Sequence, residues 1–306
     1  MRNTFMNTIV DACKIHDNMI IISGDAGLGV FDEFKDIYPD KFLNLGVAEQ
    51  NMASFSAGLA MTGFKVYMYN IIPFLLYRCY EQVRNDICYQ KLPIVLVGIG
   101  SGITYAPAGV THYSVEDIGI AQTLPNLSII SPIDSVEAKN AALYSLSTQS
   151  PVYVRIAKRG EPRIHQKEDF DITVPQIIRD GSEVAILFHG SIAGEVMAAY
   201  DHLVTQDIHP MLISVPMLYP LKIDVLLDIL RNMEFVVSVE EHFINTGLGS
   251  ILSRIYSEFH PPWKLKPMGI PFKFIYEVKD AAGMRKHFNI SHEGIEKMVQ
   301  QVLEGD

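Results

Sequence analysis

Short apolar runs that alternate with helical segments constrain the fold of this chain more than any other feature. Clear examples are 18–23 (NMIIIS), 93–98 (PIVLVG) and 184–188 (VAILF). Each run is too short for a helix and is apolar on both faces, which is typical of strands buried on both sides of a parallel sheet. Segments with helical patterns, such as 4–16, 51–62 and 73–89, lie among them. The alternation predicts an α/β fold whose parallel sheets are covered by helices on both faces.

The chain is long enough for two such domains. Its 306 residues are 48% apolar, which is too apolar for a disordered chain and sufficient for two hydrophobic cores. The segment 160–174 (GEPRIHQKEDFDITV) is charged, contains a proline and interrupts the alternation of strands and helices. We therefore predict two doubly wound α/β domains, residues 1–165 and the smaller 176–306, joined by a linker at 166–175.

Charge and cysteine content exclude several classes of protein. Acidic residues outnumber basic ones by 35 to 25, and the net charge of −10 argues against a surface for nucleic acids or anionic membranes. Three cysteines at unrelated spacings do not form a zinc motif and favour a reducing compartment. The N-terminus lacks the apolar core of a signal peptide, and no apolar run approaches the roughly 20 residues that span a bilayer. We expect a soluble cytoplasmic protein with no metal site of its own, whose partners are small molecules or proteins.

Two polar segments that follow buried strands carry candidate catalytic residues. Glu49 lies in the run 44–52 (NLGVAEQNM), just after a short strand and at the start of a helix. The helix dipole also favours an acid in the first turn, so a purely structural role is open. His112 lies in the run 109–117 (GVTHYSVED), after a strand and a loop broken by glycine and proline. Ligands bind at the carboxyl ends of parallel strands, which makes both residues candidates for one site there.

In their order and separation, these two segments resemble the pyrimidine-binding domain of the transketolase family of thiamine-diphosphate enzymes. The resemblance continues in the runs 81–86 (EQVRND), 90–93 (QKLP) and 131–134 (SPID). The runs 238–242 (SVEEH) and 247–250 (GLGS) are similar to that family's C-terminal domain, so the resemblance covers nearly the whole chain. It implies a pyrimidine-binding domain followed by a transketolase C-terminal domain.

The resemblance also implies roles for single residues. Thiamine diphosphate must lose a proton from its thiazolium carbon, and a glutamate bonded to the ring nitrogen of its pyrimidine promotes this loss; the resemblance places Glu49 in that role. His112 would donate hydrogen bonds to the substrate. Asp25 matches a strand-end acid that lines the cofactor site. The aromatic position against the pyrimidine falls on Leu75, and Phe74 is the neighbouring candidate.

The diphosphate-binding domain of a complete transketolase is not expected in this chain. That domain binds the diphosphate and Mg²⁺ with Gly-Asp-Gly and a later Asn, but Gly24-Asp25-Ala26 departs from it at the third position. Asn51, at the matching distance, lies inside the glutamate segment instead of after another strand. The resemblance implies the C-terminal subunit of a split transketolase, inactive alone, whose N-terminal partner subunit holds the diphosphate and Mg²⁺. We expect a heterotetramer with two copies of each chain.

Two positions predict an unusual substrate. Where transketolases have a histidine and an aspartate for sugar phosphate and a sugar hydroxyl, this chain has Gly100 and Ala108. The basic pair Lys158 and Arg159 remains at a strand end where the family holds phosphate, although exposed basic residues need no such role. We expect two-carbon ketol transfer with an atypical sugar or sugar phosphate, for example a modified, non-phosphorylated or nucleotide-linked sugar.

Two other functions remain open on the sequence. The beta subunit of a 2-oxoacid dehydrogenase decarboxylase would use the same cofactor but pass an acyl group to a lipoyl arm. The runs 111–117 (THYSVED) and 154–160 (VRIAKRG) look closer to split transketolases. A non-catalytic scaffold or regulatory subunit is the alternative from another class. The presence of Glu49 and His112 argues against a scaffold, and the two changed substrate positions argue for it.

The run 240–242 (EEH) invites a metal interpretation. Neighbouring residues of a strand point to opposite faces, so these three side chains do not converge on one ion. We expect a structural role for them in the C-terminal domain.

Overall fold

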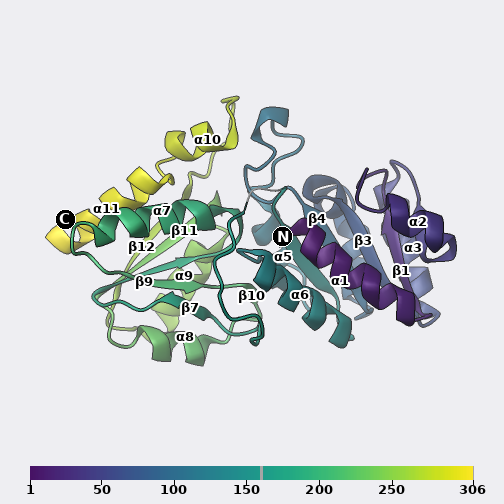
Figure 1. Ribbon diagram of the computed structural model, residues 1–306, viewed down its shortest axis with the longest axis horizontal. Helices are drawn as coiled ribbons and strands as arrows, with labels where there is room; N and C mark the ends of the chain where they lie inside the picture. Colours follow the sequence, from purple (N-terminus) through teal and green to yellow (C-terminus); the bar gives the residue numbers. More distant parts are fainter. Residues whose placement is uncertain (159–160, 306) are drawn as a thin grey trace.

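The first half of the chain supplies six strands of a seven-stranded sheet. The computed structural model describes residues 1–158 and 161–305 and shows two sheets side by side, with helices against them (Figure 1). The strands of the first sheet are Met19–Ser23 (β1), Phe42–Asn44 (β2), Lys65–Ile71 (β3), Ile94–Ile99 (β4), Ser128–Ile130 (β5), Val152–Ile156 (β6) and Met217–Tyr219 (β10). Their order is β10-β5-β6-β4-β3-β1-β2, and all neighbours are parallel except β10 and β5.

Helices cover both faces of this sheet, as the apolar strands predict. The α-helices of this half are Arg2–Ile15 (α1), Asp32–Ile37 (α2), Glu49–Met61 (α3), Tyr80–Gln82 (α4), Asp117–Gln122 (α5) and Ser135–Ser147 (α6). Ile21 of β1 packs into one core with α1 and α6, whereas Ile20 and Ile22 pack into a second core with α3. Because both faces are buried, each position of the strand must be apolar.

The predicted helix 73–89 is helical but not a regular α-helix. Residues Pro73–Tyr77 and Val83–Cys88 form π-helical turns on either side of α4. The backbone N–H of Arg78 donates to the carbonyl oxygen of Pro73 at 3.1 Å, five residues back, which closes the wider turn. Apolar periodicity near 3.6 residues does not reveal such widening, so the sequence predicted one continuous α-helix.

The second half forms a five-stranded, mostly parallel sheet. Its strands are Gln176–Arg179 (β7), Val184–Phe188 (β8), Met211–Ser214 (β9), Phe235–Phe243 (β11) and Lys264–Ile270 (β12), in the order β12-β11-β8-β9-β7. Only β7 is antiparallel to its neighbour. The helices are Ala193–Val204 (α7), Ile223–Leu230 (α8), Leu248–Phe259 (α9), Ala281–His287 (α10) and His292–Glu304 (α11). In β8, Ile186 packs with α7 and α11 while Leu187 packs with α8 and α9, so this domain is also doubly wound, as predicted.

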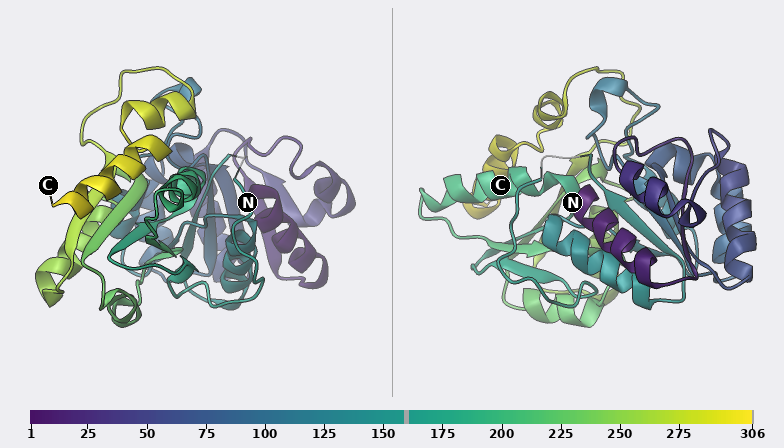
Figure 2. Two further views of the ribbon diagram at one scale, coloured as in Figure 1. Left: turned by 60° about the vertical axis from the view of Figure 1, so that its left-hand side comes forward. Right: turned by 45° about the vertical axis from the view of Figure 1, so that its right-hand side comes forward.

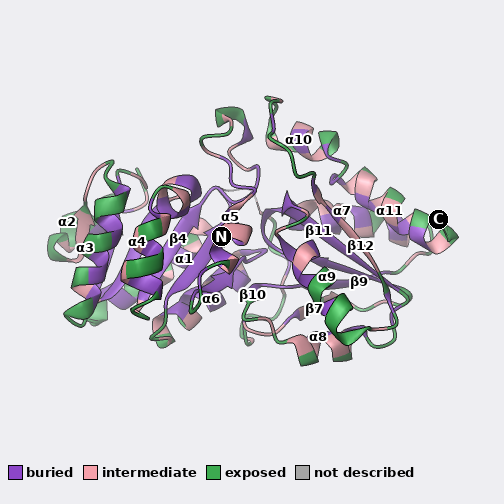
Figure 3. Ribbon diagram, turned by 180° about the vertical axis from the view of Figure 1, so that it is seen from behind, coloured by how far each residue is buried: buried purple, intermediate pink, exposed green. Residues whose placement is uncertain are grey.

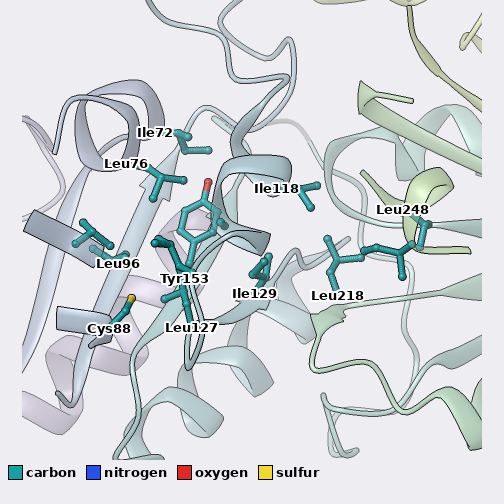
Figure 4. Close-up of a cluster of buried hydrophobic side chains, with 14 of the residues drawn as sticks. Ile72, Leu76, Cys88, Leu96, Ile118, Leu127, Ile129, Tyr153, Leu218 and Leu248 are labelled. Carbon is teal, nitrogen blue, oxygen red and sulfur yellow. The ribbon is translucent and has the colours of Figure 1, made fainter. Parts of the chain in front are cut away.

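The two halves are joined by a shared core and a shared sheet. The core that contains α3 continues through Ile118 and Ile129 to Leu218 and Leu248 of the second half (Figure 4). Strand β10, which also belongs to the second half, pairs antiparallel with β5 and completes the first sheet. The strands of both sheets are buried, and the exposed residues gather on outer helix faces and loops (Figure 3). Burial of apolar surface between the halves therefore holds them in one arrangement.

Between β6 and β7, the described residues 161–175 contain no helix or strand. The domain boundaries at 165 and 176, and the linker between them, stay a prediction.

Candidate active site

The candidate site is a cavity at the carboxyl ends of β1, β3 and β4. Its volume is 320 Å³, and residues that follow these strands line it together with neighbouring loops. Glu49, Phe74 and Tyr105 are among the lining residues. Ligands of α/β proteins bind at this edge because the loops leave the sheet there.

Glu49 lines this cavity with a buried carboxylate that is held from two sides. The residue begins α3, and its side chain is only 2% exposed. Its Oε2 accepts a hydrogen bond from Nη1 of Arg78 at 2.8 Å, and its Oε1 accepts one from Nδ2 of Asn70 at 3.3 Å. Nδ2 of Asn70 also donates to the carbonyl oxygen of Gly24 at 3.3 Å. Because a buried carboxylate is costly unless it is paired, these contacts determine where the carboxylate lies.

Aromatic side chains lie beside this carboxylate. Phe74 and Tyr105 line the cavity, and the guanidinium of Arg78 lies 4.4 Å from the ring centroid of Phe74. The ring of His112 stands edge-on to Phe74 with 5.4 Å between centroids, and 6.3 Å from the ring of Tyr105. The structure thus brings His112 next to two residues of the cavity that also contains Glu49.

Leu75 does not line the cavity, although the resemblance placed the aromatic position there. Its side chain is fully buried in the core with α3. Phe74 is half-buried and lines the cavity. Neighbouring residues of a helix point in different directions, so only one of the two can face the site. Of the two candidates, Phe74 is the one that can contact a molecule in the cavity.

The other predicted residues lie at the rim. Asp25 lines the cavity, is exposed, and has a backbone φ of +59° in the left-handed region. Its Oδ1 accepts a hydrogen bond from Nδ2 of Asn44 at 3.3 Å, and its backbone N–H donates to Oδ1 of Asn44 at 2.9 Å. Nζ of Lys158 lies 4.6 Å from the ring centroid of Tyr105. Arg159 lies outside the described residues.

The structure explains why position 100 has no side chain. Gly100 follows β4 with a φ of +91°, and a Cβ there would lie 2.1 Å from Cδ2 of Tyr105. The ring of Tyr105 therefore fills the space that a histidine at position 100 would need. Ala108 is exposed at the end of the 3-10 turn Ala106–Ala108.

Sequence reasoning missed Asn70, Arg78 and Tyr105. Asn70 had a visible signal, because it is a polar residue near the end of an otherwise apolar strand (KVYMYNI). Arg78 and Tyr105 had none, since their contacts with Glu49 and Gly100 depend on how distant loops and turns meet at the sheet edge.

A larger cavity of 490 Å³ lies beside α5 and the end of β11. Tyr77, Glu116, Phe243 and Phe272 are among its lining residues. The hydroxyl of Tyr77 donates to Oε2 of Glu116 at 3.1 Å, and burial raises the pKa of Glu116. No predicted site residue lines this second cavity, so we assign the candidate site to the smaller one.

The smaller cavity suits an aminopyrimidine ring. Such a ring has two apolar faces and an edge of hydrogen-bonding nitrogens. Phe74 and Tyr105 offer aromatic surfaces, Ile71 and Ile99 add apolar surface, and the carboxylate of Glu49 is an acceptor for the polar edge. The residues present therefore fit the pyrimidine of thiamine diphosphate.

Within residues 1–158 and 161–305, no group of three or more His, Cys, Asp or Glu side chains is placed to hold a metal ion. Cys13, Cys79 and Cys88 are buried free thiols, and burial raises the pKa of each to about 12. In the same part of the chain, every helix is too short or too polar to cross a membrane.

Comparison with known families identifies both halves of the chain. The family described as "Transketolase, pyrimidine binding domain" matches residues 1–162, and "Transketolase, C-terminal domain" matches residues 175–295. The first match alone covers more than half of the chain. The order of the two matches confirms the predicted resemblance.

Single relatives agree with these family matches. A subunit of the apulose-4-phosphate transketolase of Actinobacillus succinogenes is 30% identical over 96% of both chains, and "Putative transketolase C-terminal section" of Methanocaldococcus jannaschii is 30% identical over 99% of this chain and 96% of its own. The solved structure "Split gene transketolase, inactive beta4 tetramer" has the same fold, with a TM-score of 0.88 over 99% of this chain and 97% of that chain at 23% identity. The chain therefore belongs to the transketolase family of thiamine-diphosphate-dependent enzymes and has the domain composition of the C-terminal subunit of a split transketolase.

Proposed function

We propose that this chain is the C-terminal subunit of a split thiamine-diphosphate-dependent transketolase that transfers a two-carbon ketol unit between sugars. The observation that carries the proposal is the buried carboxylate of Glu49, held by Asn70 and Arg78 beside the aromatic wall of the cavity. An acid that only stabilised the start of α3 would gain a few tenths of a kcal/mol on the surface and would not need to be buried at a cavity.

Each cavity residue has a role in this proposal. Bound thiamine diphosphate supplies the electron sink for breaking a carbon–carbon bond. Glu49 takes up and returns a proton at the ring nitrogen of the pyrimidine, while Asn70 and Arg78 hold its carboxylate in position. Phe74 packs against the pyrimidine. His112 donates hydrogen bonds to the substrate, and Asp25 borders the cofactor at the rim.

A partner chain holds the diphosphate and Mg²⁺ in this proposal. Asp25, the acid of the altered Gly-Asp-Ala run, is paired with Asn44 at the rim of the pyrimidine cavity. The relative from Actinobacillus succinogenes is itself named as one subunit of a transketolase. We infer a partner with the Gly-Asp-Gly and Asn motif, in a heterotetramer of two copies of each chain. The three buried free thiols fit a reducing compartment, and we place the complex in the cytoplasm.

The first test is reconstitution with the partner. We expect the purified chain to show no ketol transfer, and the mixture with a partner that carries the diphosphate motif to form a ketose and an aldose from a ketose donor and an aldehyde acceptor. Acylation of a lipoyl domain from a 2-oxoacid is measured in parallel. Lipoyl acylation instead of ketol transfer would identify a decarboxylase subunit, and no turnover in a complex that assembles and binds the cofactor would identify a scaffold.

The proposed substrate is an atypical sugar. Tyr105 occupies the space above Gly100, so the pocket has an aromatic ring where a hydrogen-bonding side chain would grip a phosphorylated sugar. Lys158, beside the same ring, and Arg159 in the adjoining sequence can still bind one anionic group. The relative from Actinobacillus succinogenes is named for apulose 4-phosphate, which makes that compound a first candidate.

Steady-state kinetics of the complex test the substrate proposal. Each missing charged hydrogen bond weakens binding by about 1.5–3 kcal/mol, or ten- to a hundredfold. We therefore expect kcat/KM for xylulose 5-phosphate with ribose 5-phosphate to fall at least about tenfold below that of a housekeeping transketolase assayed beside it. Lys158→Met should raise KM for phosphorylated sugars and leave KM for non-phosphorylated sugars unchanged. Turnover of the pentose phosphates at housekeeping rates would show that Gly100 and Ala108 carry no substrate information.

A further inference from the structure

The loop that carries His112 is closed at its base within the first domain. It leaves the sheet after β4 and returns at α5, and its two ends meet at Gly102 and Ser114. The backbone N–H of Ser114 donates to the carbonyl oxygen of Gly102 at 2.9 Å, and the Ser114 hydroxyl donates to that of Gly100 at 3.2 Å. These contacts close the base of the loop but do not reach His112.

The second domain grips the outgoing side of this loop through Glu241, near the end of β11. The Glu241 side chain is 1% exposed. Its Oε2 accepts hydrogen bonds from the backbone N–H of Ile103 at 3.2 Å and from the hydroxyl of Ser191 at 2.7 Å, while its Oε1 accepts one from Nε of Arg285 at 2.6 Å. A Cβ on Gly102 would lie 2.4 Å from the same Oε2, so the close approach of loop and carboxylate requires glycine there.

The returning side of the loop is bonded to the same strand. The backbone N–H of Phe243 donates to the carbonyl oxygen of Val115 at 2.9 Å. The buried Nη2 of Arg155 donates both to the carbonyl oxygen of Ser114 at 3.2 Å and to that of Glu241 at 2.9 Å, which ties the two segments together.

A third contact reaches the residue next to His112. The hydroxyl of Tyr113 donates to the carbonyl oxygen of Ile275 at 3.2 Å, in the segment between β12 and α10. This segment and the loop project side by side from one end of the molecule (Figures 1 and 2). Few of the loop's other contacts are that far from its base, so the second domain limits how the loop moves.

We propose that the C-terminal domain positions His112 by holding the loop 100–116 at both of its sides, with Glu241 as the main positioning residue and Tyr113 as the outer contact. The catalytic role of His112 belongs to the proposed function, on which this inference rests. Glu241 touches neither cofactor nor substrate in this account. It bonds the loop directly at Ile103 and acts on catalysis only through the position of the loop.

Hydrogen–deuterium exchange of the full chain tests the loop contacts without any need for activity. Glu241→Gln keeps the shape of the side chain but replaces one accepting oxygen with an NH₂ group and removes the charge. We expect amide exchange in peptides from 100–116 to become at least about tenfold faster, because charge-assisted hydrogen bonds at the base of the loop are lost. Tyr113→Phe, which removes a single hydroxyl, should speed exchange there less.

Glu137→Gln is the matched control. Glu137 is also a buried carboxylate between the two domains, since its Oε1 accepts a hydrogen bond from the hydroxyl of Ser214 at 2.6 Å and its Oε2 accepts one from the backbone N–H of Ile133 at 2.8 Å. It does not contact the His112 loop, so exchange in 100–116 should stay unchanged. Equal acceleration in both variants, or unchanged exchange in Glu241→Gln and Tyr113→Phe, would overturn the proposal.

Kinetics of the complex separate positioning from a general structural effect. Glu241→Gln should lower kcat at least tenfold while the Kd for thiamine diphosphate stays unchanged. In a His112→Ala background, the same change should cost no further activity, because its effect passes through His112. A further loss of the same size in that background would overturn the proposal. If the wild-type complex has no turnover, the proposed function fails, and the exchange measurements alone decide the inference about the loop.

Discussion

Alanine at position 49 should reduce ketol transfer by the assembled complex about 10²–10⁴-fold, the usual contribution of a proton-transferring side chain. The change removes the acceptor that faces the cavity and leaves Arg78 and Asn70 without their carboxylate partner. The measurement is kcat of the complex at saturating cofactor and sugar. Circular dichroism and size-exclusion chromatography of the same samples check that fold and assembly are unchanged.

Glu293→Ala is the matched control for a first-turn acid. Glu293 lies in the first turn of α11, is exposed, and lines none of the cavities described above. Its loss should leave kcat unchanged, since an exposed acid at a helix start interacts only with the dipole and nearby side chains. Activity that survives Glu49→Ala would reduce Glu49 to the same structural role and contradict the proposed function.

Loss of the carboxylate of Asp117 should destabilise the chain by about 3–5 kcal/mol, the largest stability effect that we expect from a single change. Oδ2 of Asp117 accepts hydrogen bonds from Nε of Arg155 at 2.7 Å and from the hydroxyl of Tyr153 at 2.6 Å, and the ion pair is fully buried. Asp117→Ala therefore leaves the guanidinium charge of Arg155 inside the protein without a counter-charge. Urea unfolding at neutral pH measures the free energy of unfolding.

Two further variants show whether the buried charge causes this loss. Asp117→Ala combined with Arg155→Met should lose less than the sum of the single changes, because the uncompensated charge is gone. Asp228→Ala, which breaks the exposed pair with Arg231, should change the free energy of unfolding within experimental error. A loss for Asp117→Ala no larger than for Asp228→Ala would contradict the account.

Part of the candidate site could be predicted because its residues follow strands. Glu49 and His112 lie directly after or near the ends of buried strands, and parallel strands bring such ends to one edge of a sheet. The contacts that tune these residues were not predictable in the same way. Arg78 reaches Glu49 from a π-helical turn, and Tyr105 fills the space above Gly100 from within a loop. Both depend on backbone geometry that no residue pattern specifies.

The fold class, the two domains and the family membership were determined by the sequence alone, because apolar runs, helical periods and motif order are local properties of the chain. Only the tertiary structure decided that β10 of the second half completes the first sheet, that Phe74 and not Leu75 faces the cavity, and that Glu241 holds the loop of His112. These outcomes join residues far apart in the chain. They depend on how close-packed domains meet, and the free energy of that packing is spread over contacts that no single segment contains.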